Sequence, residues 1–297
     1  MKTSTVLLLA TSALTATPPG LPRVDADLQA GLRDVLANSG LEALVRDRKL
    51  SVSLLDLSDP EMERYASVND RQMMYAASLP KVGILLAAFE AFRQGWLQHT
   101  AAIEASLTRM IRLSSNDDAS RIIQRLGYEF IARTLASPRY RLYDPAAQGG
   151  IWVGKAYGPS GLRQHIEIWR PEPVSGEWHA ANTLQVARFF WMLARGGLAT
   201  PVFNASMKLM LGSPATSEYF VEGLRELGVQ HLYRKFGTYA DVHCDAVLVE
   251  HGGKRYVAVA MVNDPQGPRI LPRLIRELHQ LAMRTQEYGQ QGIQRFR

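Results

Sequence analysis

The chain has a single cysteine, Cys244, among its 297 residues, so it cannot form an intramolecular disulfide. Apolar residues surround Cys244 on a strand-like segment, which indicates a small core side chain more often than a reactive thiol. The seven histidines are scattered, and neither a His-x-x-x-His nor a Cys-x-x-Cys spacing occurs. We therefore expect no metal site and no cofactor.

Long apolar runs are also missing. Met1 and Lys2 precede the apolar stretch 6–10, and small residues continue to a break at 18–20. This pattern predicts a signal peptide over residues 1–20, which is too short to span a membrane. No later segment approaches the roughly 20 apolar residues of a membrane-spanning helix. We expect a periplasmic or secreted protein with no integral membrane segment.

No basic tract accompanies the formal net charge of +6, because the arginines are spread through helix-like segments. No nucleic-acid-binding motif occurs either, so we expect no nucleic-acid partner. With 46% hydrophobic residues, a chain of this length can bury a sizeable core. We expect residues 21–297 to form a single domain that stays a monomer.

Hydrophobic periodicity predicts strands at both ends of the domain and helices between them. We expect a helix over 24–47, strands over 50–57 and 64–67, helices to about 138, a long loop to about 181, helices over 182–197 and 204–228, strands over 231–238, 242–250 and 255–263, and a helix over 268–286. This order predicts an α+β fold with one antiparallel sheet. Residues 21–75 and 229–297 would form a sheet lobe, and 76–228 a mainly helical lobe. Such a long loop is usually functional, and the cleft between the lobe of helices and the last strands is the expected site.

One Ser-x-x-Lys occurs, Ser78-Leu79-Pro80-Lys81, where a turn enters an apolar helix. Residues three apart share a helix face, so the Lys81 amine lies within reach of the Ser78 hydroxyl. Serine needs an adjacent base to become a nucleophile, and burial can give lysine that role by lowering its pKa. The helix N-terminus also favours a developing oxyanion. As a bare string, the motif is equally consistent with chance.

Two further strings follow. Ser114-Ser115-Asn116 lies at a turn between predicted helices. The Ser114 hydroxyl could pass a proton to a leaving group there, and the Asn116 carboxamide could hold a substrate amide. The alternative is an ordinary cluster of helix-capping residues. Lys235-Phe236-Gly237-Thr238 lies on a predicted strand, where Gly237 would let an extended substrate lie alongside while Lys235 and Thr238 face its carboxylate. An exposed edge-strand lysine is the alternative.

Taken in order, the three strings resemble the S-x-x-K, S-D-N and K-T-G signature of the class A β-lactamases and penicillin-binding enzymes. The resemblance covers the chain from about residue 24 to about residue 286. It implies a β-lactamase-like fold, in which an antiparallel sheet from the N- and C-terminal segments packs against a central all-helical lobe.

The resemblance also implies a role for each residue. Ser78 would be the acylated nucleophile, Lys81 its general base or proton relay, and Ser114 the donor to the leaving nitrogen. Asn116 would hold the substrate's side-chain amide, and Lys235 with Thr238 would bind its carboxylate beside Gly237. The backbone N–H groups of Ser78 and Thr238 would form the oxyanion hole.

Two residues depart from the signature. Ser115 stands where the family has aspartate, and Phe236 replaces a small hydroxyl residue. The first change loses a carboxylate that orders the turn, and the second removes a hydroxyl from the strand beside the site. The segment between Ser78 and Ser114 is also short for a β-lactamase. We expect these departures to affect β-lactam turnover more than acylation.

Arg170-Pro171-Glu172 matches the start of the family loop whose glutamate activates the deacylating water. No Leu-Asn pair follows, so a solvated proline-rich loop is the simpler interpretation and Glu172 as the base is a hypothesis. His243 and Asp245 alternate on a predicted strand and would share one face. They would either shape the pocket as a hydrogen-bonded pair or serve the structure.

The sequence thus predicts a secreted serine hydrolase that works through an acyl-serine, of the class A β-lactamase-like kind. The substrate would be a small-molecule or peptidoglycan-like amide. A DD-peptidase or esterase on the same fold, and a non-catalytic ligand-binding relative, remain the alternatives.

Overall fold

Alternating apolar residues in the two terminal segments build one antiparallel sheet. The computed structural model describes residues 20–144, 146, 148–158, 168–212, 214–229 and 231–284. Its five-stranded sheet has the order β2-β1-β10-β9-β8. The strands are β1 (Leu50–Asp56), β2 (Arg64–Val68), β8 (His231–Tyr239), β9 (Val242–His251) and β10 (Lys254–Asn263). All neighbouring pairs are antiparallel, which confirms the predicted α+β class.

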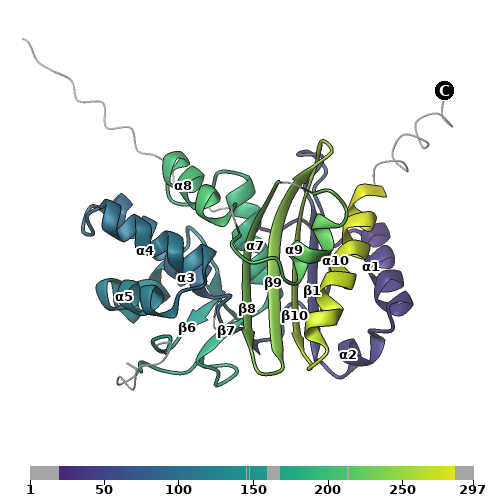
Figure 1. Ribbon diagram of the computed structural model, residues 1–297, viewed down its shortest axis with the longest axis horizontal. Coiled ribbons are helices and arrows are strands. Elements are labelled where there is room, and N and C mark those ends of the chain that lie inside the picture. The colour runs from purple at the N-terminus through teal and green to yellow at the C-terminus, as the bar shows by residue number, and fades with distance from the viewer. Residues whose placement is uncertain are drawn as a thin grey trace, which may run out of the picture.

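The sheet joins the two ends of the chain. β1 pairs with β10 so that Leu50 lies opposite Val262 and Asp56 lies opposite Tyr256. The N-terminal hairpin therefore extends the C-terminal meander (Figure 1). The predicted signal peptide, apart from residue 20, lies outside the described residues.

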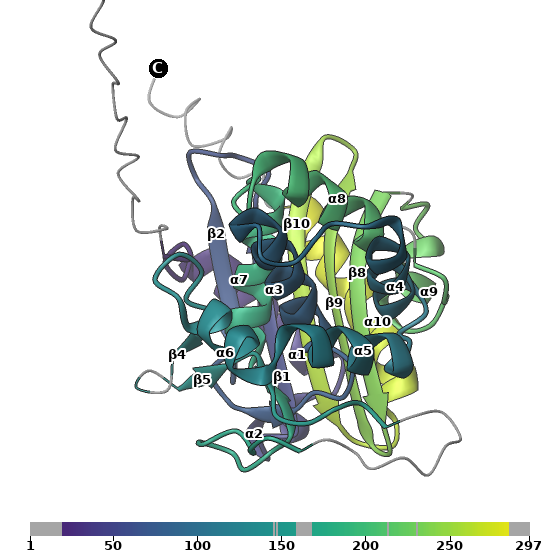
Figure 2. The same cartoon turned by 90° about the vertical axis from the view of Figure 1, so that its left-hand side faces the viewer.

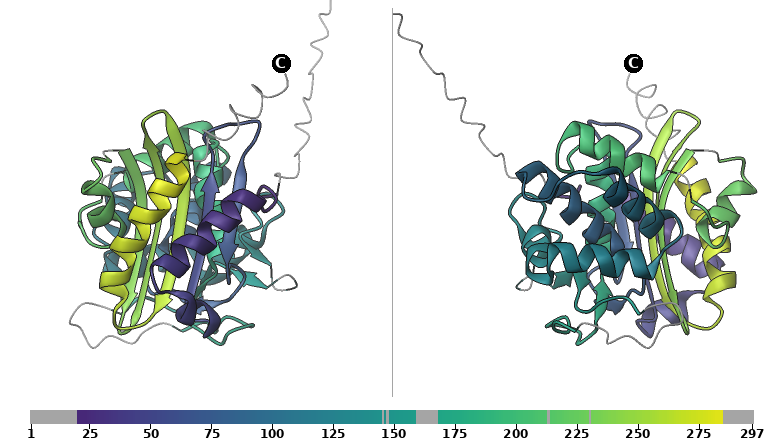
Figure 3. Two further views of the ribbon diagram at one scale, coloured as in Figure 1. Left: turned by 90° about the vertical axis from the view of Figure 1, so that its right-hand side faces the viewer. Right: turned by 60° about the vertical axis from the view of Figure 1, so that its left-hand side comes forward.

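Three helices cover one face of the sheet: α1 (Ala26–Asn38), α9 (Phe220–Arg225) and α10 (Gly267–Arg284). In Figure 3, α1 and α10 lie across this face. Side chains that alternate along the strands, such as Val247 and Val249 of β9, form a fully buried core with them.

The remaining long helices pack on the other face (Figures 1 and 2). They are α3 (Lys81–Gln94), α4 (Ala101–Arg112), α5 (Asn116–Leu126), α6 (Tyr128–Ala136), α7 (Thr183–Ala194) and α8 (Pro201–Leu211). Every residue of α3 from Lys81 to Phe92 is buried. This explains why α3 is apolar all round and not amphipathic. Helix α9, which the sequence placed in the helical lobe of residues 76–228, instead packs against α10.

Three sequence predictions need correction. The helix expected over 24–47 is broken into α1 and α2 (Glu42–Arg46), because Gly40 adopts a positive φ of 68°. The helix expected over 204–228 is two helices, α8 and α9. The long loop contains four short strands, β4 (Tyr143–Asp144), β5 (Gly149–Gly150), β6 (Trp152–Val153) and β7 (His179–Ala181).

One of these strands brings the loop to the start of α3. β7 lies between β6 and β3 (Met74–Tyr75) in a small three-stranded sheet. The N–H of Ala76 also donates to the carbonyl of His179 at 2.7 Å. The segment that leads into Ser78 is therefore held between the long loop and the main sheet. Among the described residues, no helix is long and apolar enough to cross a membrane.

Candidate active site

Ser78 lies in the turn between β3 and α3, where the backbone is strained. The preceding residue, Ala77, has a φ of 47°, which is unfavourable for a residue with a Cβ. The turn is closed by the N–H of Leu79, which donates to the carbonyl of Ala76 at 2.9 Å. Pro80 follows with a φ of −62°, an angle that already suits the start of a helix. Ser78 therefore lies just before the N-terminus of α3, which begins at Lys81.

Lys81 is fully buried at the first position of α3. Its ammonium group donates to the Ser114 carbonyl at 2.6 Å and to Asn116 Oδ1 at 2.7 Å. Burial lowers the pKa of Lys81 from 10.5 to about 7, because a low-dielectric site disfavours the charged form. Near neutral pH, a substantial fraction of Lys81 is therefore the free amine that a general base requires.

No hydrogen bond joins the Lys81 amine to the Ser78 hydroxyl within the described part of the chain. Both groups nevertheless lie in the same helical turn, since the N–H of Lys81 donates to the carbonyl of Ser78 at 3.3 Å. Proton transfer between them requires the amine to turn from Ser114 towards Ser78. Catalytic hydrogen bonds commonly tighten only when substrate is bound.

Ser114 connects two buried lysines. Its hydroxyl accepts a hydrogen bond from the Lys235 ammonium group at 3.0 Å, while its carbonyl accepts from Lys81. Its φ is 55°, so the backbone is strained here too. Desolvation lowers the pKa of Lys235 well below its usual range, and the nearby charge of Lys81 acts in the same direction. This network brings together three of the residues that the sequence singled out.

β8 passes directly beside the nucleophile. A Cβ on Gly237 would lie 2.5 Å from the Ala76 carbonyl oxygen and 2.8 Å from the backbone nitrogens of Ser78 and Leu79. Real Cβ atoms do not approach so closely, so only glycine fits. The Ser78 nitrogen thus lies beside β8, and its N–H donates no hydrogen bond to any described residue. A free N–H beside the nucleophile is what an oxyanion hole needs.

Asn116 and Thr238 line the same cavity as Ser78. The Thr238 hydroxyl is 3.0 Å from His243 Nδ1, and the Tyr219 hydroxyl is 3.1 Å from the same nitrogen. Asp245 does not join this group, because its carboxylate pairs with Arg234 at 2.8 Å, with both side chains buried. His243 and Asp245 therefore form no pair with each other; each is held by other partners.

The two departures from the signature have different consequences. Ser115 caps α5 by accepting a hydrogen bond from the N–H of Asp118 at 3.2 Å, so a hydroxyl orders this turn where a carboxylate was expected. Phe236 does not line the cavity with Ser78. Its ring instead lies 4.6 Å from the Lys235 ammonium group and 4.5 Å from the Arg234 guanidinium.

Glu172 is fully buried, so the predicted surface position is wrong for this residue. Its Oε1 accepts from the Tyr143 hydroxyl at 2.6 Å. Its Oε2 accepts from the N–H groups of Val174 and Ser175 at 3.0 and 2.6 Å and from the Ser175 hydroxyl at 2.8 Å. Glu172 thus orders its own loop, and it is absent from the residues that line the cavity with Ser78.

The long loop contributes side chains that sequence analysis missed. Tyr157 is buried, its hydroxyl donates to the Ala77 carbonyl at 3.3 Å, and its ring lies 4.4 Å below the Lys81 ammonium group. His179 stacks on Tyr157 with ring centres 4.0 Å apart. Its Nδ1 is buried without a partner among the described residues. Burial, followed by the charges of Lys155 and Lys81, lowers the pKa of His179 to about 3, so the imidazole is neutral.

The only sequence signal for Tyr157 and His179 was the length and aromatic content of the loop. Neither residue belongs to a motif, and β7 places His179 beside Ala76 only in the folded chain.

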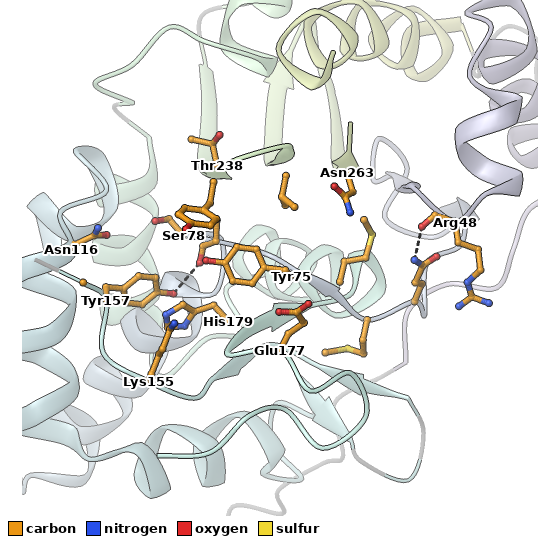
Figure 4. A pocket seen from close by; sticks show the side chains of 17 residues that line it. Arg48, Tyr75, Ser78, Asn116, Lys155, Tyr157, Glu177, His179, Thr238 and Asn263 are labelled. Atoms are coloured by element: carbon orange, nitrogen blue, oxygen red, sulfur yellow. Dashed lines mark hydrogen bonds between the residues drawn. The ribbon is translucent and has the colours of Figure 1, made fainter. Parts of the chain in front are cut away.

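The cavity has a volume of about 740 Å³, and Ser78 is among the residues that line it. Figure 4 shows Ser78, Asn116, Tyr157 and Thr238 around one end. No cluster of three or more His, Cys, Asp or Glu side chains that could hold a metal ion occurs within the described residues. A half-neutral buried lysine, a serine at a helix N-terminus and a free N–H can together activate and stabilise an attack on a carbonyl.

A family model for the β-lactamase enzyme family matches residues 34–137 and 154–286. No curated protein matches the chain. Among solved structures, a β-lactamase from Sphaerobacter thermophilus is 17% identical with a TM-score of 0.63, covering 86% of this chain and 97% of that one. PBP-A is 20% identical with a TM-score of 0.62, covering 89% and 98%. A β-lactamase from Xanthomonas campestris pv. campestris is 14% identical with a TM-score of 0.62, covering 86% and 97%.

Proposed function

Because this chain belongs to the β-lactamase enzyme family, we propose that it is a serine hydrolase that cleaves an amide bond through an acyl-Ser78 intermediate. The observation that carries the proposal is the buried network in which Ser114 accepts hydrogen bonds from Lys235 at 3.0 Å and Lys81 at 2.6 Å next to Ser78. A protein that only bound a ligand would acquire no acyl group on Ser78, which separates it from the proposed hydrolase. We expect it to act as a monomer in the periplasm or outside the cell.

Acylation begins when the free amine of Lys81 takes the proton of the Ser78 hydroxyl. The Ser78 oxygen then bonds to the substrate carbonyl carbon, and the negative charge that develops on the carbonyl oxygen is stabilised by the N–H groups of Ser78 and Thr238. The Ser114 hydroxyl donates its proton to the leaving nitrogen as the amide bond breaks. Ser114 regains a proton from the ammonium group of Lys81, which restores the amine.

Substrate orientation follows from the other residues at the cavity. Asn116 binds an amide of the substrate, and the Thr238 hydroxyl binds its carboxylate. Lys235 is buried behind the cavity wall and acts through Ser114, whose hydroxyl accepts its hydrogen bond at 3.0 Å. Gly237 leaves room for an extended substrate to approach β8, because a side chain there would meet the nucleophile's own backbone. A β-lactam presents this combination of amide carbonyl, side-chain amide and carboxylate. A mutant of PBP-A, a structural relative, has been solved as an acyl-enzyme complex with penicillin G.

Hydrolysis of the acyl-enzyme needs an activated water, and Glu172 is held elsewhere. Its Oε1 accepts a hydrogen bond from Tyr143, and its Oε2 accepts hydrogen bonds from its own loop. This observation favours a second candidate, a DD-peptidase or esterase of the same fold. β-Lactams would acylate such an enzyme, and the acyl group would be released only slowly. The two candidates share acylation and differ in the lifetime of acyl-Ser78.

A burst experiment with a chromogenic β-lactam distinguishes the candidates. We expect one equivalent of ring opening per protein molecule, dependent on Ser78. Continued turnover after the burst supports a β-lactamase. A burst without turnover supports the second candidate, the DD-peptidase or esterase. Two outcomes would contradict the proposal. One is ring opening that persists in Ser78→Ala. The other is a wild-type protein that opens no ring and acquires no acyl group from penicillin or ester substrates.

A further inference from the structure

The cavity continues well beyond the catalytic residues. One end is lined by Ser78, Asn116 and Thr238, and the other end by Arg48, Asn263 and their neighbours. In Figure 4, Asn116 and Arg48 lie at opposite ends of the pocket, with Tyr75 and Glu177 between them. We call the part from Ser78 to Arg48 the long arm.

The main sheet sets the length of the long arm. Tyr239 of β8 lies opposite Val242 of β9, and Val242 lies opposite Asn263 of β10. The N–H of Asn263 then donates to the Lys49 carbonyl at 2.8 Å, just before β1. The ends of four strands thus follow one another from the catalytic end to Arg48. Neighbouring strands lie about 4.8 Å apart, so three spacings give about 14 Å.

The opposite wall gives a compatible length. Residues 72–78 run along the cavity, with all but Ala76 lining it. At one end the Gln72 side chain donates to the Arg48 carbonyl at 2.6 Å, and at the other end is Ser78. Because the chain turns at Ala77, this wall is shorter than the roughly 20 Å that six fully extended residues would span. Met73 and Met74 in this wall provide adaptable apolar contacts.

Charge is unevenly distributed along the long arm. Arg48 is exposed at the far end, and its guanidinium forms no ion pair with any described residue. Glu177 lies between the ends, on the same cavity. An anionic group of the ligand would be attracted by Arg48 and repelled by Glu177. Near Glu177, a backbone N–H of the ligand is the better partner.

We propose that the long arm binds an extended, peptide-like acyl chain of about four residues whose far end carries a carboxylate at Arg48. The length follows from about 14 Å at about 3.4 Å per extended residue. This inference rests on the proposed function, because it assigns the acyl side of the same substrate. It adds a specificity site that lies outside the three catalytic motifs.

The test uses peptide thioesters with one leaving thiol. Their acyl parts have one or four residues, and the four-residue chain carries either a succinyl cap, which ends in a carboxylate, or a neutral acetyl cap. In the wild-type protein we expect the four-residue substrates to exceed the one-residue substrate in kcat/KM on the order of tenfold. The succinyl cap should add a further factor of about two to five, as is typical of an exposed ion pair, and this factor should fall at high salt.

Arg48→Gln is the test variant and Arg46→Gln its control, since Arg46 is exposed in the same helix region and does not line the cavity. The succinyl-to-acetyl ratio should fall to about one in Arg48→Gln and stay at the wild-type value in Arg46→Gln. Equal rates for one- and four-residue substrates, or a succinyl preference that survives in Arg48→Gln, would overturn the proposal.

Binding separates this inference from the proposed function. Both four-residue peptides carry a fluorescent label on the C-terminal residue, so that the succinyl carboxylate stays free. Fluorescence anisotropy should show that the succinyl peptide binds Ser78→Ala more tightly than the acetyl peptide does. If this preference appears while wild-type Ser78 is never acylated, the hydrolase proposal fails and the long arm stands. If penicillin G acylates Ser78 but neither cap nor length matters, the long arm fails alone.

Discussion

Lys81 makes the rate of acylation depend on pH. Only the free amine accepts the Ser78 proton, and burial lowers the pKa of Lys81 to about 7. We therefore expect the acylation rate to rise about tenfold per pH unit below pH 6 and to level off above about pH 8. Stopped-flow measurement with a chromogenic β-lactam between pH 5 and 9 tests this.

The matched control for the pH profile is Lys208→Met, because Lys208 pairs with Glu250 away from Ser78. It should keep the wild-type curve. An acylation rate that stays constant from pH 5 to 8 would show that Lys81 is not the titrating base.

Gly237→Ala tests the close passage of β8. Its Cβ would lie 2.5 Å from the Ala76 carbonyl oxygen and 2.8 Å from the Ser78 nitrogen, so β8 or the nucleophile turn must move. We expect the unfolding free energy to fall by about 1–3 kcal/mol and acylation to slow on the order of a hundredfold as the oxyanion hole is distorted. Denaturant titration and acylation kinetics measure the two effects.

Gly197→Ala is the corresponding control, since its nearest new contact would be an ordinary 3.5 Å to the Met192 carbonyl oxygen. This variant should acylate at the wild-type rate. Wild-type acylation by Gly237→Ala would contradict the geometry of the site.

At the scale of elements, the loop around Glu172 depends on one carboxylate. The Glu172 carboxylate accepts hydrogen bonds from Tyr143 and from two backbone N–H groups. Glu172→Gln replaces one of its oxygens with an NH2 group, which would then face one of these donors. We expect a loss of about 1–3 kcal/mol in unfolding free energy. The decay rate of acyl-Ser78 should stay the same, because both Glu172 oxygens are already held by Tyr143 and by the loop itself.

Tyr143→Phe is the companion variant, which removes a single hydrogen bond to Glu172 and should lose less stability. Intact-mass measurement of acyl-enzyme decay decides the role of Glu172. A decay that slows at least tenfold in Glu172→Gln at unchanged stability would make Glu172 the hydrolytic base after all.

Elements with strong periodicity were predictable from the sequence. The strands expected over 231–238, 242–250 and 255–263 match β8, β9 and β10 to within a residue or two, because their apolar runs end at clear turns. Short strands such as β7 were not predictable, since their two or three residues gain stability only by pairing with β3. His179 was missed for that reason, because it lies on β7, and Tyr157 was missed because it lies in the loop outside any strand.

Glu90 links helix α3 to the rest of the helical lobe and sets an acid limit on the stability of the whole molecule. Burial would raise its pKa, but hydrogen bonds from Arg93, Gln94 and Tyr140 outweigh burial and lower the pKa to about 2. A folded pKa below the unfolded value of 4.5 stabilises the protein above that pH, and the contribution is lost as the pH falls towards 2. The loss should amount to about 2–3 kcal/mol.

Denaturant titrations at pH 7 and pH 3 test this contribution. Glu90→Gln should lose less stability between the two pH values than the wild type. Glu129→Gln, a change at an exposed position on α6, should behave like the wild type. Identical pH dependence in wild type and Glu90→Gln would refute the assignment.

The global architecture followed from the order of segments, because strands at both ends of the chain must pair to bury their apolar faces. The three motifs lie close together in the fold, where Lys81 and Lys235 both donate hydrogen bonds to Ser114. Sequence reasoning could not foresee that Glu172 would be buried, since its partners Tyr143 and Ser175 are ordinary loop residues. The length of the cavity was equally hidden, because it depends on how four strand ends align.

The most direct test of the central claim is to locate the acyl group. The protein would be incubated briefly with penicillin G, quenched in acid, digested and mapped by mass spectrometry, with Ser78→Ala and the exposed-helix variant Ser206→Ala in parallel. We expect one penicilloyl group on the peptide that contains Ser78 in the wild type and in Ser206→Ala, and none in Ser78→Ala. An adduct on another residue, or one that persists in Ser78→Ala, would contradict Ser78 as the nucleophile.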